Sequence, residues 1–256
     1  MVGVSRASKI ACVIMVLVFV GSVWGTKAAY AAPPLALDGV GTHTSNCLLQ
    51  FCSQLLTTTK GHDVIVVVVE TCCTATVSAI NDSSGLNFTQ RLSYASNSAS
   101  NVTILEFYAL ATSPLKSDNI SVVDDLCCVT IWGMQVIAVQ GANTKAIFDP
   151  NPSIPATVSC PGDSGPNTCS ASIEASSIDF VIASAGIDDD VSCGSPLPEG
   201  GFQPPPGFTN IALNSNFEVD YAITSTPQNN VVFLCNNTDV LAIVVDAISF
   251  HGAFGR

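Results

Sequence analysis

The cysteines are the side chains of this chain with the most reactive chemistry. A thiolate is a zinc ligand, and two neighbouring thiols can cycle between reduced and oxidised forms. No Cys-x-x-Cys spacing occurs among the 11 cysteines, and Cys12 belongs to an N-terminal leader, which leaves an even number. An exported chain is expected to oxidise such a set to disulfide bonds. We therefore expect structural disulfides among Cys47, Cys52, Cys72, Cys73, Cys127, Cys128, Cys160, Cys169, Cys193 and Cys235.

The sequence does not determine which cysteines pair. Closeness in the chain favours a bond between Cys160 and Cys169 across a Pro/Gly-rich loop. A bond between Cys193 and Cys235 would tie a second loop to a late strand.

Two cysteine doublets, at 72–73 and 127–128, each lie beside an apolar segment. Neighbouring side chains on a strand point to opposite faces, so at most one member of each doublet easily cross-links the same two strands. The other members would reach elsewhere, with Cys47 and Cys52 as candidate partners.

Carboxylates are the second group of side chains with a chemistry to consider. The run Asp188, Asp189 and Asp190 and the pair Asp124 and Asp125 offer the oxygen ligands that Ca²⁺ prefers. No Asp-x-Asp-x-Asp-Gly spacing occurs, so a solvated turn is the alternative. A calcium-dependent binding module would melt at a lower temperature in the presence of a chelator.

A pair of carboxylates can also hydrolyse glycosidic bonds, and Glu106 with Glu174 or Glu218 is such a pair. No Gly-x-Ser-x-Gly segment, His-Glu-x-x-His segment or P-loop is present. The sequence therefore favours a non-enzymatic protein without a cofactor, and a secreted carboxylate-dependent hydrolase is the alternative.

The negative charge of the chain disfavours anionic partners. Its formal net charge is −12, and the leader carries Arg6, Lys9 and Lys27 but no acid, so the rest of the chain is still more acidic. Nucleic acids bind to clustered Lys and Arg, and anionic lipids also repel an acidic surface. We expect neither nucleic acid nor a membrane surface as a partner.

The sequence suggests two relations to glycans, glycosylation of the chain and binding of glycans by the chain. The first is glycosylation, because five Asn-x-Ser/Thr sequons occur, and four of them fall on expected strand ends and turns between residues 81 and 119. One face would then carry sugar and would not serve as a protein interface. The sequons are at Asn81, Asn87, Asn101, Asn119 and Asn236.

The second is binding, because exposed aromatic rings stack on sugars. Phe202, Phe208, Tyr94 and Tyr221 are the aromatic residues expected to be accessible, and the stiff, proline-rich loop 200–208 is a candidate recognition loop.

These residues must be positioned by β-strands. Apolar segments are short, rich in Val, Ile, Thr and aromatic residues, and separated by Asn, Asp, Gly, Ser or Pro, whereas no long helical period occurs. The expected strands are 48–58, 63–71, 76–81, 87–94, 102–111, 119–123, 129–139, 172–176, 178–186, 208–213, 217–224, 231–235 and 240–250.

The pattern within the strands predicts an all-β fold, an antiparallel two-sheet β-sandwich of jelly-roll or immunoglobulin-like character. The continuous run 64–69 predicts a strand in the middle of the sandwich. In 217–221, apolar residues alternate with Glu218 and Asp220, which predicts acids on a solvated face. Segments 148–169 and 188–207 are expected to be long, disulfide-tied loops.

The first 31 residues predict a cleavable signal peptide. Arg6 and Lys9 precede an apolar run, which ends before Ala29, Tyr30 and Ala31, small-residue spacing that suits signal peptidase. An archaeal pilin-type leader is the alternative. Residues 32–256 are expected to form a single β-sandwich domain, secreted or at the cell surface, with no later membrane span.

Several short motifs of the chain resemble a group of uncharacterised secreted β-sandwich proteins of archaea, notably ammonia-oxidising lineages, with looser bacterial relatives. The resemblance implies export and a β-sandwich, and it assigns no catalytic residues. The motifs are Asp63-Val64-Ile65-Val66-Val67, Phe88-Thr89-Gln90-Arg91, Glu106-Phe107-Tyr108-Ala109, Gly141-Ala142-Asn143-Thr144 with Phe148-Asp149, and Ile178-Asp179-Phe180-Val181.

Together these observations predict a non-enzymatic extracellular or cell-surface protein. Its function would be adhesion, surface assembly or glycan binding, with glycans or other surface proteins as partners. The sequence does not indicate an oligomeric state. A cleft with two facing carboxylates would favour the hydrolase, and a flat or edge-strand surface would favour assembly.

Overall fold

Strands make up all the regular secondary structure in the described part of the chain. The computed structural model describes residues 33–43, 47, 51–72, 77–97, 102–124, 131–160, 170–175, 178–187, 202–213, 217–235 and 240–250. These residues form strands β1 to β18 and no helix, hence none that is long and apolar enough to cross a membrane. The predicted all-β, antiparallel fold class is therefore confirmed. The predicted leader, residues 1–31, lies outside the described residues.

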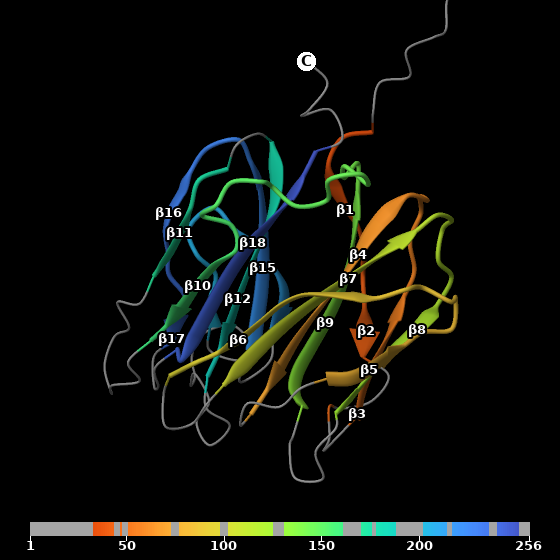
Figure 1. Ribbon diagram of the computed structural model, residues 1–256, viewed down its shortest axis with the longest axis horizontal. Helices are drawn as coiled ribbons and strands as arrows, with labels where there is room; N and C mark the ends of the chain where they lie inside the picture. The colour runs from red at the N-terminus through yellow and green to blue at the C-terminus, as the bar shows by residue number, and fades with distance from the viewer. Residues whose placement is uncertain are drawn as a thin grey trace, which may run out of the picture. The chain divides into compact units, whose positions relative to one another are not determined.

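Five strands form the sheet that we call the central sheet (Figure 1). Every neighbouring pair in it is antiparallel. β4 lies in the middle because its run of valines is buried on both faces, as expected for a strand covered on two sides. In spatial order the strands are β1 (Ala36–Val40), β9 (Ile131–Gln140), β4 (Asp63–Thr71), β7 (Thr103–Ala111) and β6 (Thr89–Ala95).

There are two further sheets: the strands of one, the amino-side sheet, are interleaved in sequence with those of the central sheet, and the strands of the other, the carboxy-side sheet, all follow β9. The amino-side sheet has the order β2 (Thr42–His43), β3 (Phe51–Leu56), β8 (Asp118–Asp124) and β5 (Val77–Asn81). The carboxy-side sheet has the order β10 (Ala156–Ser159), β18 (Ala242–Ser249), β12 (Asp179–Gly186), β15 (Phe217–Thr224) and β14 (Thr209–Leu213). Two short pairs complete the fold, β11 (Ala171–Ile173) with β16 (Gln228–Val231), and β13 (Phe202–Gln203) with β17 (Leu234–Cys235).

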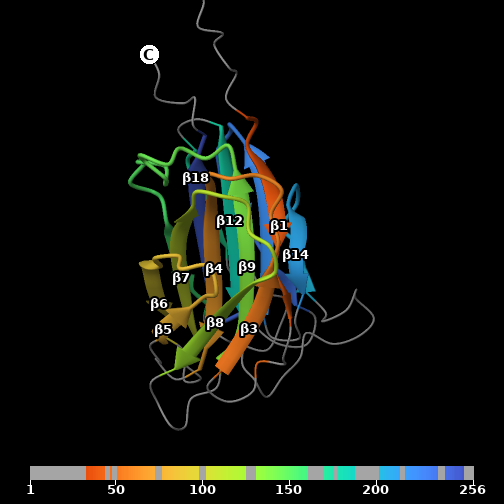
Figure 2. The ribbon, with the colours of Figure 1, turned by 90° about the vertical axis from the view of Figure 1, so that its right-hand side faces the viewer.

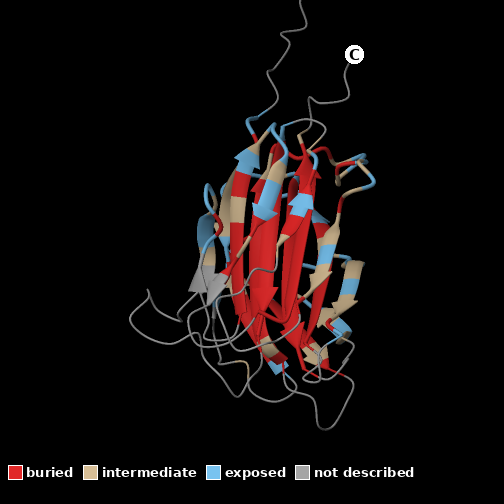
Figure 3. Cartoon of the chain, turned by 90° about the vertical axis from the view of Figure 1, so that its left-hand side faces the viewer, coloured by how far each residue is buried: buried red, intermediate tan, exposed pale blue. Residues whose placement is uncertain are grey.

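The central sheet has an apolar core on each face. Along β4, the even-numbered valines from 64 to 68 belong to a cluster shared with β12, β15 and β18. The odd-numbered residues from 65 to 69 belong to a cluster shared with β3 and β8. Figure 2 shows β3 and β8 in front of β4 and β9, with β12 and β18 behind. Figure 3, seen from the opposite side, shows that the inner strands of the carboxy-side sheet are buried. A third cluster covers the opposite face of the carboxy-side sheet.

The central and carboxy-side sheets approach closely where Gly133 of β9 faces Phe217 of β15. A Cβ added to Gly133 would lie 2.5 Å from Cδ1 of the buried Phe217 ring, so glycine makes room for that ring. We expect Gly133→Ala to lower the free energy of unfolding by about 1–3 kcal/mol, the usual cost of overpacking a core. Chemical denaturation measures the loss.

The matched experiment adds Phe217→Leu to Gly133→Ala. The smaller side chain leaves space for the new methyl group, so the double variant should lose less than the sum of the two single losses. Additive losses would contradict the close contact between the two sheets.

Several strand predictions are confirmed, and two features were predicted wrongly. The strands expected at 63–71 and 217–224 have the observed bounds of β4 and β15. The segment 148–169, expected to be irregular, contains β10, which pairs with β18 along the edge of the carboxy-side sheet. The second error concerns Glu218 and Asp220: they do share one face of β15, but both are 0% exposed, because that face is covered rather than solvated.

Candidate functional site

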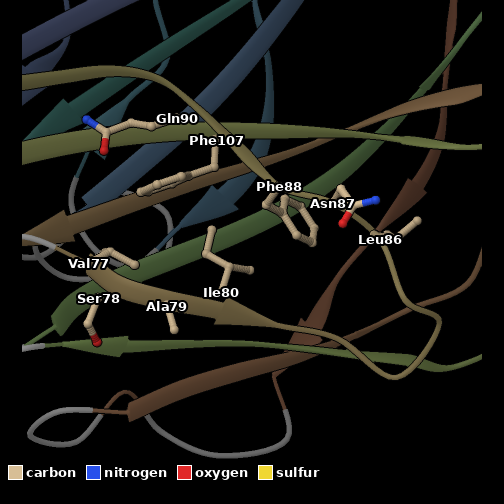
Figure 4. Close-up of a pocket in the computed structure, with 9 residues that line it drawn as sticks. All are labelled: Val77, Ser78, Ala79, Ile80, Leu86, Asn87, Phe88, Gln90 and Phe107. Atoms are coloured by element: carbon tan, nitrogen blue, oxygen red, sulfur yellow. The ribbon is translucent and has the colours of Figure 1, made fainter.

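A groove opens between the outer strands of two sheets. One wall is β5, the edge strand of the amino-side sheet, and the other is the start of β6, the edge strand of the central sheet. Its volume is about 350 Å³. Figure 4 shows the rings of Phe88 and Phe107 in the space above β5, with Val77 and Ile80 pointing toward them. The groove therefore reaches the apolar core between the two sheets.

The loop between β5 and β6 forms one end of the groove, and its sequence explains its shape. Asp82 Oδ1 accepts hydrogen bonds from the backbone N–H groups of Ser84 (2.8 Å) and Leu86 (2.9 Å), as in an Asx turn. Gly85 has a φ of 78°, a left-handed conformation that glycine adopts without steric cost. The turn brings Leu86 to the groove.

A β-bulge in β6 determines which side chains face the groove. The pairing of β6 with β7 shifts between Gln90, opposite Phe107, and Leu92, opposite Glu106. The extra residue is Arg91, and a bulge of this kind redirects the side chains that follow it. Gln90 consequently lines the groove, whereas Leu92 packs against the core shared with the carboxy-side sheet.

The groove has an uncharged lining. The two phenylalanine rings supply apolar surface, and Asn87 and Gln90 supply amides, whereas the Ser78 hydroxyl donates to the backbone carbonyl oxygen of Val123 on β8 (2.9 Å). All three of these polar residues are exposed. No ionisable side chain is among the residues of Figure 4. Such a lining favours an uncharged ligand, because a charge transferred there from water would find no partner.

Three of the predicted glycosylation sites gather beside the groove. Asn81 ends β5, Asn87 lies in the loop, and Asn119 is the second residue of β8; all three are exposed. Ser83 holds the loop to β8, since its hydroxyl donates to Asp118 Oδ1 (2.6 Å) and accepts from the N–H of Asn119 (3.0 Å). Glycosylation itself stays a prediction, and Asn101 and Asn236 lie outside the described residues.

Away from the groove, a charged triad is buried between the central and carboxy-side sheets. Arg91 Nε and Nη2 donate to the two oxygens of Asp246 at 2.8 and 3.2 Å, and Arg91 Cζ lies 4.0 Å from the centre of the Phe148 ring. Burial, and then the charge of Asp246, raises the pKa of Glu106 well above its ordinary value. In its protonated form, which this raised pKa favours, Glu106 is a hydrogen-bond donor to Asp246. One guanidinium and one proton thus neutralise the two acids.

The carboxylates proposed for hydrolysis are not brought together. Glu106 faces Asp246 between two sheets, whereas Glu218 lies on the opposite face of the carboxy-side sheet, next to Asp220. Glu174 is exposed just after β11. The pairs that the structure does form, Glu106 with Asp246 and Glu218 with Asp220, were missed, because their partners come from fold contacts and from burial.

The candidate calcium ligands Asp188, Asp189 and Asp190 lie outside the described residues, as does Asp125. Within the part of the chain that the structure describes, no three His, Cys, Asp or Glu side chains are grouped to hold a metal ion.

The cysteines are described in part. Cys47 and Cys52 form a disulfide with each other, although the sequence suggested them as partners for the doublets. Cys160 is also disulfide-bonded, and Cys72 is buried beside Trp132. The other pairings stay predictions, because the side chains of Cys73, Cys127, Cys128, Cys169, Cys193 and Cys235 lie outside the described residues.

The aromatic residues predicted to bind sugar do not form an exposed platform. Tyr221 stacks on Phe180 with ring centres 4.9 Å apart, and Tyr94 is half-buried against the same core. Phe208 packs against the third core cluster, and the Phe202 side chain lies outside the described residues. The rings of the groove were missed, since nothing in the sequence places a loop residue and a β7 residue together.

In comparisons with protein-family models, curated proteins and solved structures, nothing matches the chain. The resemblance to secreted archaeal β-sandwich proteins therefore stays a prediction.

Proposed function

We propose that this protein is an exported, non-enzymatic β-sandwich that binds an uncharged oligosaccharide at or near the cell surface. The groove between β5 and β6 is the binding site. The observation that carries the proposal is the lining of that groove, two phenylalanine rings beside two amide side chains, with no ionisable side chain.

The chemistry of an oligosaccharide fits this lining. A sugar ring has an apolar face that packs on an aromatic ring, and its hydroxyl groups exchange hydrogen bonds with amides. Gln90 supplies donors and an acceptor at the groove, and Asn87 does so in a chain that carries no glycan at that residue. The chain has a formal net charge of −12, which repels anionic ligands, and the groove offers no acid to a cationic one. A neutral ligand binds there without losing the solvation of an ion.

The shared core supports the finer assignment of the fold. The central and carboxy-side sheets pack on one apolar cluster, as the two sheets of a jelly-roll or immunoglobulin-like sandwich do, and the amino-side sheet packs on the other face of the central sheet. The signal-peptide-like leader and the even set of cysteines support an extracellular location.

The test is binding of uncharged oligosaccharides to the mature protein, first on a glycan array and then by calorimetry. We expect Phe88→Ala to weaken binding of a selected oligosaccharide by about tenfold, since truncating an aromatic contact residue typically costs more than 1 kcal/mol. Gln90→Ala should weaken it as well. Phe51→Ala is the matched control, because Phe51 is 46% exposed and lies outside the groove.

Two outcomes would overturn the proposal. One is the absence of binding to every uncharged oligosaccharide, and the other is an equal loss in Phe88→Ala and Phe51→Ala. β5 and β6 each pair with one strand only among the described residues, so a strand from another chain is the competing occupant. Self-association that Phe88→Ala abolishes, without sugar binding, would assign the groove to surface assembly instead.

A further inference from the structure

A second polar site, unrelated to the groove, lies on β15 of the carboxy-side sheet. Glu218 and Asp220 are two residues apart on this strand, so their side chains share one face, and Val219 between them points into the core next to the central sheet. Both acids are 0% exposed. The pair is therefore directed into the opposite, covered side of the sheet.

The neighbouring strands leave room for the pair on one side and bring an amide to it on the other. On β12, the residues opposite Glu218 and Asp220 are Ala185 and Ala183, whose methyl groups are small. On β14, Asn210 lies opposite Asp220, and its Nδ2 is 3.0 Å from Glu218 Oε1 and 2.9 Å from Asp220 Oδ1. One oxygen of each carboxyl group thus lies within hydrogen-bond distance of a single point.

Glu218 and Asp220 share a hydrogen bond with each other, yet two of their oxygens make none. Glu218 Oε2 and Asp220 Oδ2 are buried atoms without a hydrogen bond in the described structure. Among the described residues, no Lys, Arg or His acts on the pair: the groups that influence each acid are the other acid and Asn210. A buried carboxylate without a counter-charge is unfavourable by several kcal/mol, so the pair must be neutralised either by a proton or by a bound cation.

We propose that Glu218, Asp220 and Asn210 bind a divalent metal cation, calcium. All three side chains offer oxygen, the donor that Ca²⁺ prefers over nitrogen or sulfur. Rotating the side-chain amide of Asn210 by about 180° exchanges Nδ2 for Oδ1. Three side chains from two strands then direct oxygen atoms at one point. A cation there neutralises the pair and joins the edge strand β14 to β15.

Burial supports the same assignment. The pKa of Glu218 is raised to about 9 by burial and then by the charge of Asp220, and burial raises the pKa of Asp220 to about 6. These directions mean that the two negative charges are unfavourable together without a counter-charge. The site would be structural, since a buried ion that binds only the folded chain stabilises it.

The first test uses the mature, disulfide-bonded protein after removal of metal with a chelator. At a calcium concentration about 100 times the dissociation constant, the melting temperature should rise by about 5–10 °C. Asp220→Asn should weaken calcium binding by at least about tenfold, and Asn210→Asp, which adds a carboxylate, should tighten it. Glu106→Gln is the control, because it removes a buried acid outside the site and should leave calcium affinity unchanged.

Direct metal analysis keeps the test valid if a variant does not fold. Wild-type protein dialysed against calcium should retain one calcium ion per chain, measured by atomic emission. No retained calcium, or equal calcium affinity in wild type and Asp220→Asn, would overturn the proposal. Because Phe88→Ala leaves this site intact, failure of sugar binding and failure of calcium binding are separate results.

Discussion

Replacing Arg91 by methionine is expected to lower the free energy of unfolding by about 3–5 kcal/mol, the cost of leaving a buried charge without its partner. Asp246 is 0% exposed and accepts both hydrogen bonds of the Arg91 guanidinium. Methionine retains most of the packing of the arginine stem but supplies no charge. Asp246 and Glu106 then remain together between two sheets with only a proton to neutralise them.

Urea denaturation of wild type, Arg91→Met, Asp246→Asn and the double variant measures this coupling. The double variant should be more stable than Arg91→Met, because no unpaired carboxylate remains in it. Lys116→Met is the matched control, since Lys116 is exposed and its loss should change stability by less than about 0.5 kcal/mol. A loss for Arg91→Met no larger than that of the control would show that the triad is not a buried charge network.

Lowering the pH is expected to stabilise the metal-free protein, the reverse of ordinary acid denaturation. Burial, and then the charge of Asp38, raises the pKa of Asp63 from 3.8 to about 7. Burial likewise raises the pKa of Glu106, Glu218 and Asp246. At a pH between the pKa of a group in the unfolded chain and its raised pKa in the folded chain, the folded chain keeps a proton that the unfolded chain has lost. Stability therefore falls as the pH rises through this range.

The two pKa values of Asp63 define the pH range in which this residue changes the stability of the fold. The stabilisation that its retained proton provides is complete below pH 3.8 and is lost as the pH rises through about 7. Asp63→Asn keeps a donor toward Asp38 without the charge, so it should raise stability above that window by about 1–3 kcal/mol and flatten the pH dependence within it. Denaturation midpoints in chelator over this pH range provide the measurement.

The control for this prediction is Glu174→Gln, which removes an exposed carboxylate. It should leave the slope of stability against pH unchanged. A wild-type protein that loses stability steadily as the pH falls would contradict the prediction, as would equal slopes for wild type and Asp63→Asn.

The inner strands of this fold could be predicted from the sequence, but not what covers them. The uninterrupted valines of 63–71 identify β4 with its observed bounds, since only a strand buried on both faces is apolar throughout. The alternation in 217–224 identifies β15 equally well. A period of two assigns Glu218 and Asp220 to one face, yet it contains no information on whether water or another segment covers that face.

The edge strands and the groove were harder to predict for a related reason. β10 lies in a proline-containing segment that reads as irregular, and pairing with β18 rather than local propensity makes it a strand. The groove combines β5, a loop residue and Phe107, which meet only when two sheets pack. The sequons at Asn81, Asn87 and Asn119 marked this corner of the molecule without revealing the groove.

The valines of β4 link the two halves of the chain during folding. Their even-numbered side chains need β12, β15 and β18, all of which follow residue 178. As the chain is synthesised, β4 can pair with β7 and β9 early, yet one face of that sheet stays an uncovered apolar surface until β18 is present. Until then, the first half of the chain exposes the kind of apolar surface that makes folding intermediates prone to aggregate.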